Sequence, residues 1–210
     1  MKYDIDSFRE LKLYIASDLY RYMTSTSFKA YLRGWYIAGF RYTFFMRCCR
    51  YFGRKGLLYS PLYLFCRIAL RHYSVKYGFQ IPWQTDIGPG LCIGHYGPII
   101  VNPSSRIGAN CNITVGVLLG LNHKTDANGK SLGFEYPVVG DRVALGNGAK
   151  IIGSVTVGDD CVIGVNTVVT KDIASKSVAV GAPARIISCV GSSSLVGSFH
   201  PWSKSWVDRE

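Results

Sequence analysis

Residues 139–169 read VGDRVALGNGAKIIGSVTVGDDCVIGVNTVV, and this stretch decides the fold. An aliphatic residue recurs at every sixth position, and in four of the six units the next residue is glycine. The recurring aliphatic residues are Val139, Leu145, Ile151, Val157, Ile163 and Val169. A fixed period is the signature of a repeat architecture, in which each unit stacks on the next.

A period of six fits neither an α-helix nor a two-sided β-strand. It fits a chain that turns a corner every six residues, so that three short flat segments close a triangular coil and aliphatic side chains stack at the interstrand spacing of about 4.8 Å. Glycine suits the corners because it tolerates unusual backbone angles. An earlier run from Ile81 to Ile99 keeps the period, shifts its phase by two residues and resumes at Ile107. The sequence predicts about six coils over residues 78–190.

The cysteines are expected to be reduced and buried. Cys111 and Cys161 occupy the inward position four residues after an aliphatic residue of the repeat, where small side chains recur. The seven cysteines include the adjacent pair Cys48 and Cys49 and no CxxC spacing. This usage predicts neither a disulfide framework nor a metal site.

One long interruption breaks the repeat. Residues 120–137 are polar and rich in glycine, which predicts an excursion loop on one face of the coil, a common place for function. After Pro183 the repeat ends, and residues 191–210 are predicted to form a C-terminal tail.

The N-terminal region, residues 1–77, lacks the repeat and has the sequence pattern of helices. Ser7 and Glu10 have the spacing of a capping box, which predicts a helix from Ser7 to about Met23. Further helices are predicted over residues 28–51 and 61–73, the last because Pro61 can start a helix.

The charge of the chain is concentrated in this N-terminal region. The formal net charge is +11, and residues 1–77 hold 14 Lys or Arg against 4 Asp or Glu. Aromatic residues interleave these charges, which favours a membrane surface or a polyanionic sugar over nucleic acid, and we predict a peripheral contact of residues 28–73 with an anionic membrane. The alternative is a helical region with solvated arginines and a buried aromatic side.

Neither a membrane span nor a signal peptide is predicted. Arginines interrupt every apolar run of the N-terminal region well below the roughly 18 residues that a span needs. The acidic start Met1–Glu10 does not resemble a signal peptide. We therefore expect a cytoplasmic location, with peripheral contact at the inner face of the membrane.

The repeat, together with the stretch GAPAR at residues 181–185, resembles the hexapeptide-repeat acyltransferases. From Ile81 to Ile187 it looks most like the serine acetyltransferase branch, which includes relatives that acetylate bacterial surface sugars. The resemblance implies a mainly β fold, a left-handed parallel β-helix behind the α-helical region, assembled as a homotrimer. It also implies acetyl-CoA as co-substrate. From the cysteine usage and the aromatic residues described above, we expect neither a metal nor nucleic acid as a partner.

Acetyl transfer to an alcohol needs a base that takes the hydroxyl proton, and histidine suits this role because its pKa lies near neutrality. By resemblance, His95 matches the catalytic histidine of the serine acetyltransferases. His123 is the alternative, because the galactoside and maltose acetyltransferases carry their catalytic histidine on an excursion loop. Gln80 stands where the serine enzymes have the aspartate that orients their histidine. Its amide oxygen can fix the tautomer but cannot stabilise an imidazolium as a carboxylate does.

The acceptor is predicted from departures from the serine enzymes. Gly94, Glu135 and Tyr136 replace their aspartate and their Arg-His pair, which would leave the charged groups of a free amino acid unpaired. We therefore predict that the acceptor is a sugar hydroxyl of a bacterial surface polysaccharide or its precursor. The sugar would be bound by stacking on aromatic rings and by hydrogen bonds. The residues expected to contact this acceptor are Tyr96, Asn122, His123, Glu135 and Tyr136.

Two alternatives to this function stay open, a serine O-acetyltransferase of cysteine biosynthesis and a non-catalytic scaffold. For coenzyme A, the resemblance implies a slot between coils with cations near the phosphates. The residues matching this slot are Asn147, Val165, Thr170, Lys171 and Arg185.

Overall fold

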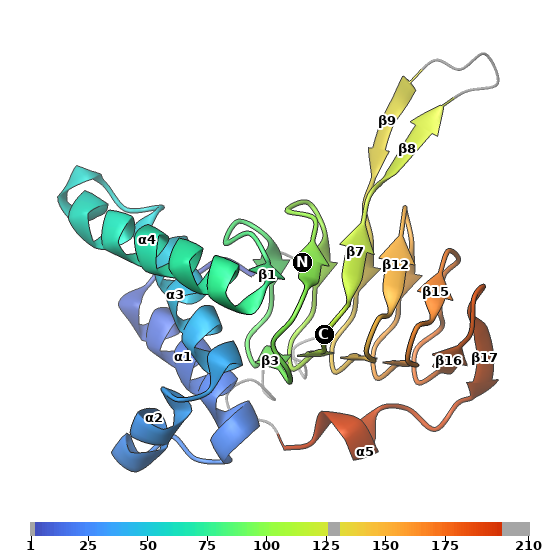
Figure 1. Cartoon of the computed structure of the whole chain (residues 1–210), viewed down its shortest axis with the longest axis horizontal. Coiled ribbons are helices and arrows are strands. Elements are labelled where there is room, and N and C mark those ends of the chain that lie inside the picture. The colour runs from blue at the N-terminus through green and yellow to red at the C-terminus, as the bar shows by residue number, and fades with distance from the viewer. Residues whose placement is uncertain (1–2, 126–130, 199–210) are drawn as a thin grey trace.

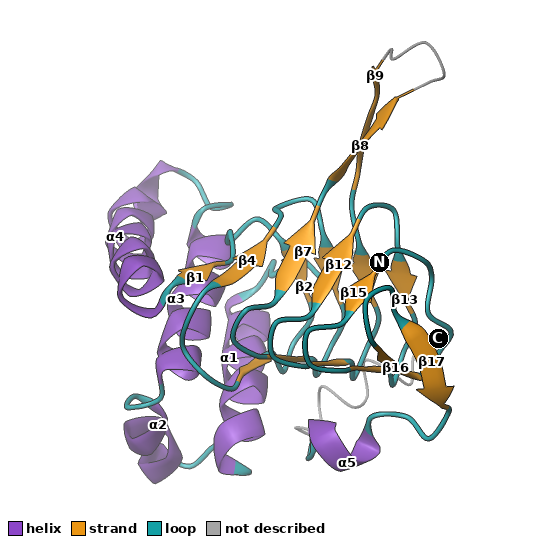
Figure 2. Cartoon of the chain, turned by 45° about the vertical axis from the view of Figure 1, so that its right-hand side comes forward, coloured by secondary structure: helices purple, strands orange, loops and turns teal. Residues whose placement is uncertain are grey.

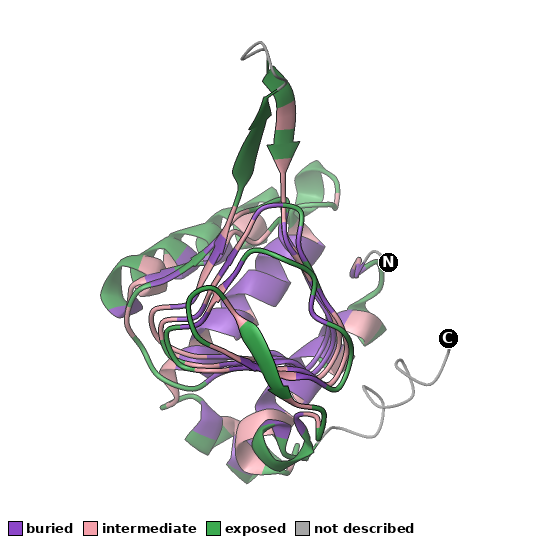
Figure 3. Ribbon diagram, turned by 90° about the vertical axis from the view of Figure 1, so that its right-hand side faces the viewer, coloured by how far each residue is buried: buried purple, intermediate pink, exposed green. Residues whose placement is uncertain are grey.

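The computed structural model describes residues 3–125 and 131–198. Helices gather at one end, and the rest of the chain winds into parallel strands from which one hairpin projects (Figure 1). Viewed along the coil, the cross-section is a triangle with a buried interior (Figure 3). The predicted parallel coil behind a helical region is therefore confirmed. His200 and the rest of the predicted tail after residue 198 lie outside the described residues, as do residues 126–130 of the excursion.

The helical region contains α1 (Phe8–Met23), α2 (Phe28–Gly34), α3 (Ala38–Phe52), the short 3-10 helix η1 (Leu57–Tyr59) and α4 (Ser60–Tyr77). The capping box is confirmed, because Ser7 Oγ accepts from the Glu10 amide at 3.1 Å and the Glu10 carboxylate accepts from the Ser7 amide at 2.9 Å. None of the described helices is long and apolar enough to cross a bilayer.

The single helix predicted over residues 28–51 is wrong, since α2 and α3 are separate. The chain turns after Gly34, where a Cβ would lie 2.4 Å from Leu19 Cδ1 of α1. This close approach packs α2 against α1, and the turn lets α3 run back across α1. α4 also continues four residues past the predicted end at Tyr73, to Tyr77.

Three parallel sheets form the sides of the triangle, and we name each by its first strand. The β1 sheet holds β1 (Phe79–Gln80), β4 (Ile99–Val101), β7 (Leu118–Gly120), β12 (Lys150–Ile152) and β15 (Val168–Val169). The β2 sheet holds β2 (Asp86–Ile87), β5 (Arg106–Ile107), β10 (Val138–Val139) and β13 (Thr156–Val157). The β3 sheet holds β3 (Cys92–Ile93), β6 (Asn112–Ile113), β11 (Ala144–Leu145), β14 (Val162–Ile163) and β16 (Val178–Val180), and β17 (Arg185–Ser188) joins it antiparallel.

The excursion is a hairpin of β8 (Asn122–Thr125) and β9 (Ser131–Glu135), which stands away from the coil (Figure 2). A short helix, α5 (Ser193–Val196), follows the coil. The β1 sheet has five strands within the described residues, fewer than the six coils predicted, because the chain turns back after Gly181 and runs antiparallel as β17.

The repeat aliphatics stack in register inside the triangle. On the β2 sheet, Ile87 pairs with Ile107, Ile107 with Val139, and Val139 with Val157, and all four are buried. Cys111 and Cys161 are fully buried, as predicted. Burial raises the pKa of the Cys111 thiol to about 12, so the thiol stays protonated at neutral pH.

The helical region closes the first coil through a buried ion pair. Asp18 of α1 and Arg47 of α3 lie 2.9 Å apart, and their side chains are 0% and 1% exposed. Arg47 also donates to the carbonyls of Ile87 and Gly88, at 2.7 and 2.6 Å. Asp18 accepts from the backbone amides of Gly90 and Leu91, both at 2.9 Å. One pair of side chains therefore satisfies four backbone groups of the first coil.

Other arginines of the basic region are structural in the same way. Arg50 is 7% exposed and donates to the carbonyls of Gln84 and Thr85. Arg21 donates to the carbonyls of Gly90 and Asn110. Arg50 is buried and Arg21 is half-buried, and both bond backbone carbonyls, so part of the basic excess serves the fold.

We predict that Asp18→Ala lowers the free energy of unfolding by about 3–5 kcal/mol, because it leaves the Arg47 charge buried without a partner. Urea unfolding measures this loss. The matched control is Asp160→Ala, which breaks the Arg142 pair at 2.7 Å where the two side chains are 18% and 28% exposed. We expect the control to cost about 1 kcal/mol. Equal losses from the two variants would contradict a special role for the Asp18–Arg47 pair.

Candidate active site

His95 lies in a corner that is longer than those below it. In the first coil, Val101 follows Ile93 by eight residues. In the next coil, their strand partners Ile113 and Leu119 are only six residues apart. The two additional residues explain the phase shift in the repeat. They also push the corner outward, so that His95 and Tyr96 are both exposed, Tyr96 by 72%.

The corner is held against the end of α4. Gly97 has a φ of +140°, and a Cβ there would lie 2.4 Å from Val115 Cγ2. Its amide donates to the Tyr77 carbonyl at 2.8 Å, and the Tyr77 and Tyr96 rings lie 6.2 Å apart. His95 therefore sits where the helical region meets the coil, on backbone that both sides fix.

Below His95, the corners between the β3 and β1 sheets form a row that we call the histidine edge. Successive corners are joined by hydrogen bonds, from the Gly148 amide to the Val115 carbonyl and from the Asn166 amide to the Asn147 carbonyl, both 2.8 Å. Asn147 and Val165 are exposed on this row. Arg185 begins β17 just after the last corner, opposite Val180, and is also exposed. Three of the residues predicted to bind coenzyme A thus lie along the same edge as His95.

The corners between the β1 and β2 sheets form the hairpin edge, from which β8 and β9 project. Asn122 pairs with Glu135 and His123 with Phe134, so the residues predicted to contact the acceptor come together at the base of the hairpin, except Tyr96, which lies beside His95. Tyr136 follows β9 directly, and His123 Nε2 lies 2.9 Å from Ser131 Oγ.

Thr170 and Lys171, also predicted for coenzyme A, follow β15 at the hairpin edge, and both are exposed. The β1 sheet separates this edge from the histidine edge. A single chain therefore does not bring the hairpin, Thr170 or Lys171 to His95, and the hairpin leaves from one corner of the triangle only (Figure 3).

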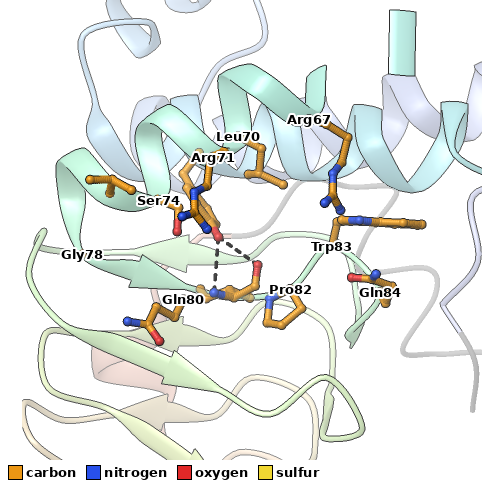
Figure 4. A pocket seen from close by; sticks show the side chains of 12 residues that line it. Arg67, Leu70, Arg71, Ser74, Gly78, Gln80, Pro82, Trp83 and Gln84 are labelled. Carbon is orange, nitrogen blue, oxygen red and sulfur yellow. Dashed lines mark hydrogen bonds between the residues drawn. The ribbon is translucent and has the colours of Figure 1, made fainter. Parts of the chain in front are cut away.

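Gln80 does not contact His95. The Gln80 side chain is exposed and lines a cavity of about 760 Å³ between α4 and β1, together with Arg67 and Arg71 (Figure 4). His95 is not among the residues that line it. Within the described part of the chain, neither Gln80 nor His95 makes a side-chain hydrogen bond, so the role of Gln80 stays a prediction.

Lys124, whose Nζ lies 3.0 Å from Glu135 Oε1, was not predicted from the sequence. A lysine directly after His123 was a visible signal, but only the folded hairpin shows that its side chain reaches Glu135. Arg67 and Arg71 were also missed as lining residues, although their spacing of four places them on one side of a helix. In residues 3–125 and 131–198, no group of three or more His, Cys, Asp or Glu side chains could hold a metal ion.

Comparison with known proteins identifies the coil. Residues 136–171 match the family described as bacterial transferase hexapeptide (six repeats). A serine acetyltransferase of Helicobacter pylori strain J99 is 40% identical over 111 residues, which cover 53% of this chain and 61% of the relative. This chain therefore spans about three fifths of the length of that relative.

Solved structures give the same result. The serine acetyltransferase of Brucella abortus strain S19 superposes with a TM-score of 0.68 over 89% of this chain and 72% of its own, at 23% identity, which shows the fold alone. A structure of the Brucella abortus enzyme in complex with coenzyme A is 27% identical, with a TM-score of 0.57, and covers 84% of this chain and 66% of its own.

These relatives contradict the predicted sugar acceptor and polysaccharide substrate. They are serine acetyltransferases, although this chain differs from their pattern at Gly94, Glu135 and Tyr136. The prediction assumed that an amino acid can be paired only from those positions. The hairpin carries a cation that the prediction left out, because Lys124 Nζ lies 3.0 Å from Glu135 Oε1.

The repeat pattern, the three parallel sheets and the matched segment agree. Residues 136–171 of the coil match the bacterial transferase hexapeptide family, and the coil is similar to that of the serine acetyltransferases.

Proposed function

We propose that this chain is an acetyl-CoA-dependent O-acetyltransferase whose acceptor is L-serine. The observation that carries the proposal is the lengthened corner, which exposes His95 at the head of the row that holds Asn147 and Val165. Relatives named serine acetyltransferase, one of them solved with coenzyme A, support both the donor and the acceptor.

In the proposed reaction, His95 takes the proton of the serine hydroxyl as its oxygen attacks the thioester carbonyl. The tetrahedral intermediate then expels the thiolate of coenzyme A, which receives the proton from His95. The acetyl group passes directly to serine without an acyl-enzyme. A neutral, exposed imidazole suits this role, since it must accept the proton and return it within one turnover.

For the acceptor, we infer that Glu135 pairs with the ammonium group of serine and Lys124 with its carboxylate. The two side chains now neutralise each other across an exposed hairpin, an ion pair of little worth in water. A zwitterion inserted between them would replace one ion pair by two. Asn122, His123 and Tyr136 lie beside this pair, and Tyr96 lies beside His95.

The two edges have to meet for this chemistry, and a second copy of the chain can bring them together. We propose a homotrimer of left-handed coils, in which the hairpin edge of one copy faces the histidine edge of its neighbour. Coenzyme A would then lie between copies, with Asn147, Val165 and Arg185 from one and with Thr170 and Lys171 from the next. The cations would bind its phosphates.

The predicted cytoplasmic location and the peripheral contact of residues 28–73 with an anionic membrane stay predictions, and both are independent of the acetyl-transfer site.

We expect His95→Ala to lower kcat by about 10²- to 10⁴-fold and to leave the affinity for acetyl-CoA unchanged, because the base acts in the chemical step. A free-thiol assay measures kcat, and calorimetry measures binding. His123→Ala is the matched control, with an expected loss below about tenfold. Full activity in His95→Ala with an inactive His123→Ala would move the base to the hairpin.

We expect L-serine to increase the release of free coenzyme A from acetyl-CoA, and Glu135→Gln to raise the KM for L-serine by about tenfold or more while the KM for acetyl-CoA stays the same. The control is Asp172→Asn, an exposed carboxylate at the hairpin edge outside the hairpin. Binding of acetyl-CoA without serine-dependent release would refute the acceptor. Absence of acetyl-CoA binding would favour a non-catalytic scaffold.

A further inference from the structure

Helix α4 is apolar on two opposite sides. Its inner side packs on α3 and buries Cys66 and Leu70. Its outer side presents Leu64, Phe65 and Ile68, which are 60%, 63% and 62% exposed. An apolar stripe on a helix normally packs against another element. Among the described residues, nothing covers the outer side of α4.

The apolar surface continues past both ends of this stripe. Before α4, η1 presents Leu57 and Leu58, which are 88% and 86% exposed. Towards α2, the rings of Trp35 and Phe45 lie 5.9 Å apart and those of Phe45 and Phe65 lie 6.2 Å apart, and Trp35 is 40% exposed. We call this surface the outer face. Contiguous apolar surface of this kind marks an interaction site, and α4 is exposed along its length (Figure 3).

The charge around the outer face is of one sign. The sequence has no Asp or Glu between Asp18 and Asp86. On α4, Arg67, Arg71 and Lys76 are exposed beside the apolar stripe. A second copy docked face to face would oppose cations with cations, whereas anionic lipid provides the missing negative charge. Charge complementarity therefore favours a bilayer over self-association.

The cavity at the edge of the outer face fits the same partner. Arg67 and Arg71 line it from α4, and Gln80 and Gln84 line it from the first coil (Figure 4). Arg67 is held over the Trp83 ring, 6.0 Å from its centroid. Within the described residues, neither arginine has an acidic partner. Guanidinium groups bind phosphate through paired hydrogen bonds, so this cavity suits a lipid phosphate.

We propose that the outer face docks on the surface of an anionic phospholipid bilayer. Helix α4 lies in the plane of the interface, with Leu57, Leu58 and Phe65 at the boundary of the acyl chains and with Arg67 and Arg71 on lipid phosphates. This inference uses neither His95 nor the hairpin, so it stands or fails separately from the proposed acetyl transfer.

The experiment is flotation of the full chain with vesicles of phosphatidylcholine, with and without phosphatidylglycerol. We expect binding to the anionic vesicles that weakens as salt is raised. Replacing Leu64, Phe65 and Ile68 together by serine should lower the partition coefficient by about tenfold or more. Replacing Arg67 and Arg71 by glutamine should lower it by about fivefold for each charge, on anionic vesicles only.

The matched control is Ile187→Ser with Val190→Ser, because these side chains are 64% and 80% exposed at the far end of the coil. We expect this control to bind as the unmodified chain does, and circular dichroism checks that every variant is folded. Absence of binding to anionic vesicles, or an equal loss in the control, overturns the proposal. The proposal is also overturned if, without lipid, the triple serine variant sediments with a smaller mass than the unmodified chain. That result would make the outer face an interface between copies of the chain. If calorimetry shows that the chain binds inorganic phosphate but flotation shows no vesicle binding, the membrane proposal is overturned and the cavity is an anion site.

Discussion

The rest of the structure depends on how the first coil is closed. A stack of parallel strands ends in a row of backbone groups without a further strand to bond them, and such an edge invites pairing with other chains. Here Asp18 and Arg47 form hydrogen bonds with four of these groups. The two side chains are buried, and their opposite charges neutralise each other. Burying two charges is favourable only when hydrogen bonds complete the pair, as they do here.

Neighbouring side chains extend this closure. The Tyr42 hydroxyl bonds the carbonyl and the amide of Ile81, and the Tyr22 hydroxyl does the same for Ile93. The helical region is therefore an end cap of the coil, built from side chains in place of a strand. Its apolar residues share one hydrophobic core with the coil interior. This role explains why so many polar and basic side chains of α1 and α3 are buried.

The closure also positions the candidate site. Ile93, bonded by Tyr22, directly precedes the lengthened corner, and Tyr77 at the end of α4 holds that corner from the other side. Two additional residues are accommodated there because the first coil has helices, not another coil, above it. The remaining coils keep six residues per corner and stack without room for an insertion at the histidine edge. The outer face and the candidate site thus both arise from the helical region, one on each side of it.

The sequence determined the coil, because a strict period of six with small inward residues has few packing solutions, and it determined the capping box of α1 through a local contact. It also indicated His95, through its place directly after Gly94 and its match to the catalytic histidine of the serine acetyltransferases. It did not determine where the second helix breaks, which strand pairs in the hairpin, or which arginines are buried. Those depend on contacts between residues far apart in the chain, such as Asp18 with Arg47 and Lys124 with Glu135. The sugar acceptor, argued from Gly94, Glu135 and Tyr136, was contradicted by the serine acetyltransferase relatives and not by the structure of the hairpin. Only the tertiary structure decided that basic residues alike in sequence are of two kinds, those that bond the buried end of the coil and those that remain exposed on the surface.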